Sequence, residues 1–129
     1  MSKIYNIYLN GLLIGTTELE KADVPMGVVI GDLRFTDQKF GYDLLKEYCE
    51  NNQIELASDY PEDKMISTTN ISELKITNDK GIEIKGVENQ ITGMDKEEYE
   101  ISIFGIPYPF YKEEFPHHVK DYENMFNKE

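Results

Sequence analysis

Apolar and polar residues alternate with a period of two along most of this chain, the pattern of β-strands that bury one face. The first such stretch, KIYNIYLNGLLIGTTEL, is divided by Asn10-Gly11, a dipeptide that tolerates the positive φ angles of a type I′ turn. The pattern therefore predicts a β-hairpin. Its expected core positions are Ile4, Leu9, Leu12 and Ile14, with Tyr5, Ile7 and Tyr8 divided between the two faces.

A third strand is predicted over residues 26–35, where apolar and β-branched residues resume after Pro25. Gly27 and Gly31 lie inside this stretch, and glycine in a strand favours a bulge or the close approach of another backbone segment. Such features bend a sheet toward closure. The preceding segment ADVPMG is interpreted as a connection between strands, with a ligand-binding loop as the alternative.

The period changes to that of a helix after Thr36. This change predicts one main helix over about residues 38–52, with Asp37 as its N-terminal cap and Asn51-Asn52 at its end. Its apolar stripe consists of Phe40, Leu44, Leu45, Tyr48 and Cys49. Because a nucleophilic cysteine needs a nearby base and no histidine is local, we expect Cys49 to be a buried core side chain.

Short alternating segments return after the acidic loop SDYPEDK, in the stretches MISTTN, SELKITN, IEIKGVEN and YEISIFGI. Turn residues separate them at 78–81 and 92–95. Short strands joined by turns predict an antiparallel arrangement. The expected fold is one α+β domain over residues 1–129, in which a largely antiparallel, strongly bent sheet is packed by the main helix and a short C-terminal helix.

The stretch IPYPFYKEEFPHHVK at 106–120 concentrates prolines, aromatic residues and both histidines. Pro107 and Pro109 lack the backbone donors that a sheet interior needs, so a strand is expected to end before them. Pro116 suits the first turn of a last helix. The aromatic residues are expected to pack against the core where the chain leaves the sheet. One histidine is expected beside them, and the other toward solvent or an acidic neighbour.

Composition adds a strong charge bias to this picture. The 129 residues include 25 acidic and 13 basic ones, for a net charge of −12. Nucleic acid and acidic membrane surfaces are disfavoured as partners, because binding to phosphates depends on lysine and arginine. No apolar run approaches the ~20 residues of a membrane helix, and a single cysteine without a signal-peptide pattern favours a cytoplasmic location.

The negative charge is unevenly distributed. Residues 43–63 contain seven acids and one lysine, so they carry −6 of the total −12. Because the predicted helix needs its apolar stripe for the core, these carboxylates are expected to face water. They form the predicted partner-binding set, with Tyr60 and Tyr48 as aromatic anchors: Asp43, Glu47, Glu50, Glu55, Asp59, Tyr60, Glu62 and Asp63.

Sequence motifs for catalysis are absent. The chain has no GxxxxGK[ST], GxGxxG, GxSxG or HExxH pattern, and no cofactor is predicted. Adjacent histidines lack the i, i+4 spacing of a zinc pair, so no metal site is predicted and no catalytic residue is assigned. Glu113-Glu114 is interpreted as a solvated surface pair. A secondary set of candidates remains in the C-terminal stretch: Tyr108, Tyr111, Glu113, Glu114, His117 and His118.

A small, acidic, tyrosine-rich chain without motifs resembles the bacterial immunity proteins that neutralise secreted nuclease toxins. The resemblance is one of overall profile and implies a basic protein partner, bound by charge attraction and aromatic anchors. Two alternatives stay open. One is a small enzyme or ligand-binding domain that uses the stretch from Tyr108 to His118, and the other is a homo-oligomeric structural subunit of a phage or secretion particle.

Overall fold

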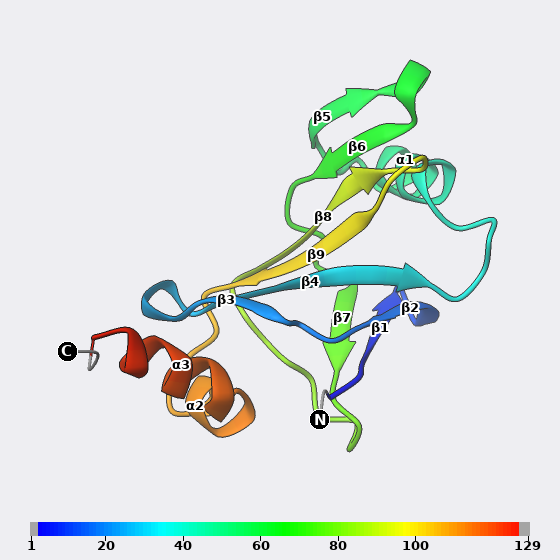
Figure 1. Cartoon of the computed structure of the whole chain (residues 1–129). Coiled ribbons are helices and arrows are strands. Elements are labelled where there is room, and N and C mark those ends of the chain that lie inside the picture. Colours follow the sequence, from blue (N-terminus) through cyan, green and yellow to red (C-terminus); the bar gives the residue numbers. More distant parts are fainter. Residues whose placement is uncertain (1–2, 127–129) are drawn as a thin grey trace.

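The computed structural model describes residues 3–126, in which nine strands and three α-helices alternate with two short 3-10 helices (Figure 1). In chain order the elements are β1 (Tyr5–Leu9), β2 (Leu12–Thr17), β3 (Lys21–Asp23), η1 (Val24–Met26), β4 (Val28–Phe35), α1 (Tyr42–Asn51), β5 (Leu56–Tyr60), η2 (Pro61–Asp63), β6 (Met65–Thr68), β7 (Leu74–Thr77), β8 (Glu88–Met94), β9 (Tyr99–Phe104), α2 (Phe110–Glu114) and α3 (Pro116–Phe126).

All the paired strands are antiparallel, which confirms the predicted α+β class. The sheet order is β5-β6-β8-β9-β4-β2-β1-β7, and β3 pairs with β4 beside this path. Strands β1 and β7 cross the direction of β8, β9 and β4, so the sheet folds over on itself (Figure 1). The predicted strong bend is therefore present.

Hydrogen bonds connect the two ends of the bent region. Asn89 of β8 donates from Nδ2 to the carbonyl oxygen of Leu74 in β7, at 2.7 Å. The backbone N–H of Ile71, just before β7, donates to the carbonyl oxygen of Asn89 at 3.0 Å. Strand β7 thus returns beside β8, and the six strands from β8 to β7 enclose the core in the manner of an incomplete barrel.

Gly31 permits a close approach of two chain segments in this bend. A Cβ atom at Gly31 would lie 2.2 Å from Oγ1 of Thr17 and 2.7 Å from the backbone nitrogen of Leu19. Only a glycine leaves room for the end of β2 to pass so close to β4. The close approach expected at this position is confirmed.

The N-terminal hairpin is confirmed, with Leu9 paired to Leu12 across a turn in which Asn10 and Gly11 have φ angles of 50° and 85°. Leu9 and Ile14 are buried as predicted. Ile4 and Leu12 are not, with 47% and 51% of their surfaces exposed. Ile4 precedes the inward-facing Tyr5 and so points outward, whereas Leu12 adjoins the exposed turn.

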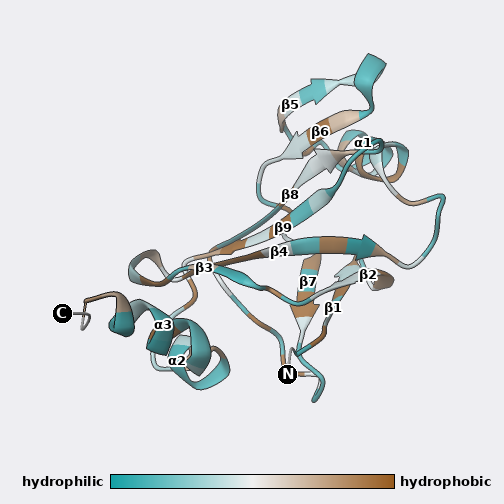
Figure 2. Cartoon of the chain, in the orientation of Figure 1, coloured by the Kyte–Doolittle hydropathy of each residue, from teal (hydrophilic) through white to brown (hydrophobic). Residues whose placement is uncertain are grey.

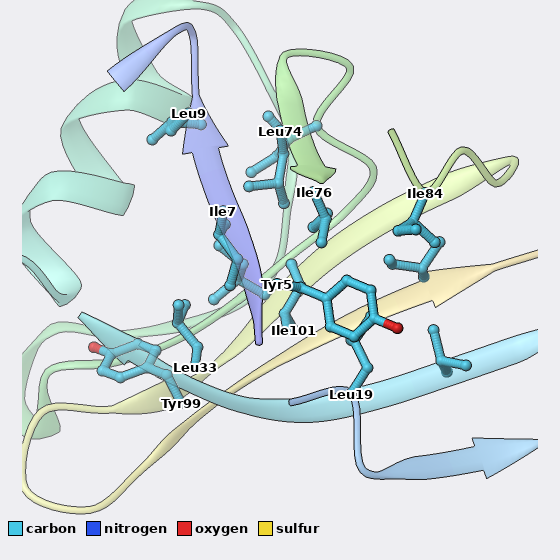
Figure 3. Packing of buried hydrophobic residues seen from close by; sticks show 14 of the residues in the cluster. Tyr5, Ile7, Leu9, Leu19, Leu33, Leu74, Ile76, Ile84, Tyr99 and Ile101 are labelled. Carbon is cyan, nitrogen blue, oxygen red and sulfur yellow. The ribbon is translucent and has the colours of Figure 1, made fainter. Parts of the chain in front are cut away.

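The core lies between the two crossing parts of the sheet. Ile7 of β1, Ile76 of β7 and Ile101 of β9 are fully buried and approach one another in Figure 3. Leu45 and Cys49 of α1 are also fully buried, so this helix covers one end of the core. The interior character predicted for Cys49 is confirmed.

The main helix exists but is shorter than predicted, since α1 begins at Tyr42 and ends at Asn51. Asp37 does not cap it, because its Oδ1 accepts the N–H of Lys39 at 2.8 Å within a local turn. Asp95, from the β8–β9 turn, instead accepts the N–H of Tyr42 at 2.9 Å. The cap of α1 comes from a residue distant in the sequence.

Three segments of the sheet also differ from the predictions. Residues 58–60, expected at the start of the acidic loop 58–64, instead form the end of the edge strand β5. The segment IEIK at 82–85 makes only an isolated bridge between Glu83 and Thr77. Strand β8 continues through Met94, so the predicted turn at 92–95 is displaced to Asp95-Lys96. Continuous pairing with β9 on one side and β6 on the other holds residues 92 and 93 in the strand.

The C-terminal stretch leaves the sheet after Phe104, and α3 begins at Pro116 as predicted. The short helix α2 was not predicted. Tyr111 and Phe115 are fully buried, whereas Tyr108 is 51% exposed. Among residues 3–126, no helix is both long enough and apolar enough to cross a bilayer.

Candidate functional site

The predicted partner-binding residues gather at the end of the molecule formed by α1, β5 and η2, at the upper right of Figure 1. Asp43, Glu47 and Glu50 recur at i, i+4 and i+7 along α1, which places them on the face opposite Leu45 and Cys49. Figure 2 shows η2 in the hydrophilic colour. We call this surface the acidic end; it comprises Asp43, Glu47, Glu50, Glu55, Asp59, Tyr60, Glu62 and Asp63.

Asp59 joins β5 to α1. Its carboxylate accepts hydrogen bonds from Nζ of Lys46 and from the hydroxyl of Tyr42. These two donors hold the pKa of Asp59 below its ordinary value, with the lysine contributing most. Burial and the bond to Asp59 raise the pKa of Tyr42 to about 12. Asp59 was expected to face water, but its side chain is only 19% exposed because it bridges two elements.

Lys64 ties the end of η2 to the first turn of α1. Its Nζ lies 2.9 Å from Oδ1 of Asp43 and 5.2 Å from the centre of the Tyr42 ring. Lys46 also lies 3.5 Å from Oε2 of Glu50, one turn along the helix. The two lysines therefore fix α1, β5 and η2 as one continuous surface and neutralise part of its charge.

Four carboxylates of the acidic end make no ion pair with any residue between 3 and 126. They are Glu47, Glu55, Glu62 and Asp63, and all four are exposed. Tyr60 is 54% exposed beside them. Tyr48 packs partly buried against the core, and burial raises its pKa. Of the two tyrosines predicted as anchors, Tyr60 is thus the more accessible.

A polar hollow of about 420 Å³ adjoins the acidic end at the N-terminus of α1. Tyr99 lines it and donates a 2.7 Å hydrogen bond to Oδ1 of Asp95. The hollow brings carboxylates from the end of β4 and from the β8–β9 turn next to Asp43, and the sequence did not indicate this. Its charged lining residues are Asp32, Arg34, Lys39, Asp43, Asp95, Glu97 and Glu98.

The sequence signal for this extension was the run DKEE at 95–98, which resembles an ordinary solvated turn. The pairing of β8 with β9 forms that turn, and the hydrogen bond from Tyr42 to Asp95 places it at the start of α1. Arg34 does not fully neutralise the carboxylates of the hollow, because its guanidinium also pairs with Glu18 at 3.0 Å. The acidic surface therefore extends beyond the segment that the sequence identified.

Glu114 is buried, contrary to the expectation of a solvated Glu113-Glu114 pair. Its carboxylate accepts the hydroxyl of Tyr5 at 2.8 Å and Nδ2 of Asn78 at 3.0 Å, and Lys3 lies 3.5 Å away. Burial and Glu114 raise the pKa of Tyr5 above its ordinary value. This cluster attaches α2 to β1 and to the turn after β7. Glu113 remains exposed.

Other members of the secondary set also have structural contacts. The hydroxyl of Tyr111 donates to the carbonyl oxygen of Val28 at 2.9 Å. His118 is buried, stacks on Phe115, and places Nε2 2.8 Å from the carbonyl oxygen of Leu19. His117 is exposed, so the predicted division between the two histidines is confirmed. In the described part of the chain, no three His, Cys, Asp or Glu side chains group as a metal site would require.

Comparison of the chain with protein-family models, with curated proteins and with solved structures gives no match. The site must therefore be interpreted from its own residues. Its distinguishing chemistry is a surface of exposed, partly unpaired carboxylates with one accessible tyrosine, beside a polar hollow.

Proposed function

We propose that this chain is a cytoplasmic binding protein that inhibits a basic protein partner, and specifically an immunity protein that neutralises a basic, nuclease-like toxin. The acidic end is the proposed contact surface. One observation carries the proposal: half of the net charge lies in residues 43–63, and four carboxylates of that segment are exposed without an ion pair in residues 3–126.

Unpaired surface carboxylates suit a partner that supplies the missing cations. A nuclease has a basic groove for phosphates, and an acidic surface attracts such a groove over a distance set by ionic strength. Charge of this kind acts mainly on the rate of association. Nucleic acid itself would be repelled, so the proposed partner is a protein.

Affinity requires buried contacts in addition to steering. Tyr60 is the proposed aromatic anchor, because it is half exposed and lies between Asp59 and η2. The ion pairs of Lys46 and Lys64 hold the surrounding backbone in place before binding. A preorganised surface loses less conformational entropy when the complex forms.

The test is a series of association rates with the protein encoded by the neighbouring reading frame, using poly-lysine as a nonspecific polycation. The variant replaces the unpaired set, Glu47, Glu55 and Glu62 by glutamine and Asp63 by asparagine. We expect association at low salt to slow by ~10-fold or more, and the difference to shrink as salt screens the charges. Dissociation should change less.

A matched variant controls for total charge. It replaces exposed acids elsewhere, Glu88, Glu113 and Glu123 by glutamine and Asp79 by asparagine, so that both variants lose four charges. It should slow association much less, because its charges lie on other elements. If the two variants slowed association equally, a specific acidic contact surface would be contradicted. The same would follow if the partner associated with the wild type no faster than poly-lysine does.

A further inference from the structure

Helix α3 carries an apolar stripe that extends past the body of the protein. His118 and Val119 are each 7% exposed, whereas Met125 and Phe126 are 68% and 67% exposed. Counted from His118, these residues and Tyr122 stand at i, i+1, i+4, i+7 and i+8, so they share one face of the helix. The face is covered over its first turns and uncovered over its last.

Two apolar grooves flank the place where α3 meets η1. Pro25 and Tyr122 line both of them. One groove, of about 370 Å³, also has Met125 in its wall, and the other, of about 440 Å³, has Tyr108 and Val119. The uncovered turn of α3 therefore continues into a concave apolar surface.

The exposed apolar area is large enough for a specific contact. Met26, Tyr108, Met125 and Phe126 are each 51% to 68% exposed. At ~200 Å² for a large side chain, they offer on the order of 500 Å² per molecule. Patches of this size on a soluble protein commonly mark an interaction site. Two such patches would bury about 1,000 Å² together, near the lower limit for a specific interface.

We propose that this surface, made by η1, Tyr108 and α3, binds a second copy of the chain in a two-fold dimer. In an antiparallel arrangement of the two α3 helices, Phe126 of each copy faces the groove beside Val119 of the other. Each uncovered turn then fills the concave surface that the other copy presents. A two-fold interface uses the same patch twice, as this pairing does.

Charge favours this face over the others for self-association. A chain with a net charge of −12 repels its own copies. The acidic end lies at the opposite end of the molecule from α3 in Figure 1, and charges separated by more than a Debye length of ~8 Å are largely screened. The charged residues that line the two grooves are Lys112 and three acids, Asp23, Asp121 and Glu123, so the patch carries less negative charge than the acidic end. The dimer leaves both acidic ends free.

The experiment measures molar mass by sedimentation equilibrium from about 1 to 200 µM, a range suited to an interface of this size. The wild type should show a concentration-dependent dimer that persists in high salt. The double variant Met125→Glu, Phe126→Glu should raise the dissociation constant at least ~10-fold, and so should Met26→Glu on η1. Circular dichroism checks that the variants fold.

The matched control is Leu12→Glu with Val87→Glu, because these side chains are 51% and 74% exposed, in β2 and in the loop before β8. It adds the same charges and should leave the dimer intact. The proposal is overturned if the wild type stays monomeric up to 200 µM. It is also overturned if the control and the patch variants weaken the dimer equally, or if none of them weakens it. Binding of the monomer to phosphatidylcholine vesicles through Met125 and Phe126 would likewise overturn it.

The charge variants of the acidic end should not alter the dimer, so the two proposals fail independently.

Discussion

Neighbouring residues of similar type have different environments in this protein, and Glu113 and Glu114 are the clearest pair. Glu113 is exposed, while Glu114 is buried beneath Tyr5 and Asn78. The sequence suggests two solvated carboxylates because the partners of Glu114 lie 109 and 36 positions away. At the scale of a single residue, burial depends on contacts that local pattern does not encode.

Glu114→Ala should destabilise the fold strongly. It leaves the hydroxyl of Tyr5 and the amide of Asn78 buried without their acceptor, so we expect the free energy of unfolding to fall by about 2 to 4 kcal/mol. Urea unfolding followed by circular dichroism measures this. Glu113→Ala is the matched control and should change stability by no more than about 0.5 kcal/mol. Similar losses for the two variants would mean that the buried cluster is not a stabilising contact.

At the scale of an element, the sequence predicted helices and strands well where their pattern is strong and local. The hairpin at Asn10-Gly11, the strands at β4, β6, β7 and β9, and the start of α3 all follow from period and turn residues. The start of α1 did not, because its cap, Asp95, is 53 positions from Tyr42. Asp37 has suitable chemistry for a cap but uses it in its own turn.

Asp95→Ala should therefore destabilise the protein more than Asp37→Ala. Asp95 accepts both the N–H of Tyr42 and the hydroxyl of Tyr99, and its loss should cost about 2 kcal/mol, against about 0.5 kcal/mol or less for Asp37. Asp95→Asn keeps an oxygen acceptor and should cost less than Asp95→Ala. Thermal and urea unfolding of the three variants would test this order. A larger loss for Asp37→Ala would contradict the cap seen here.

At the scale of the whole molecule, the two ends differ in chemistry. The acidic end gathers carboxylates from α1, β5 and η2, whereas the other end exposes the apolar surface of η1 and α3. The sequence identified the acidic segment from residue counts alone. It could not identify the hollow beside it or the uncovered turn of α3, because both depend on how distant elements meet.

The charge of the acidic end should lower stability at low ionic strength. Glu47, Glu55, Glu62 and Asp63 have no ion pair within residues 3–126, so their mutual repulsion is not offset by contacts there. Salt screens such repulsion, and we expect the Tm of the wild type to rise as NaCl increases from about 10 to 150 mM.

The variant that neutralises these four carboxylates should be more stable than the wild type at low salt, by about 2 to 5 °C in Tm, and the difference should narrow as salt is added. Differential scanning calorimetry of both proteins across the salt series provides the measurement. The matched variant at Asp79, Glu88, Glu113 and Glu123 should gain less, since those carboxylates lie on separate elements. A loss of stability on neutralising the acidic end would show that these carboxylates stabilise the fold. A gain in stability would show that these carboxylates destabilise the fold, as expected of side chains retained for binding a partner.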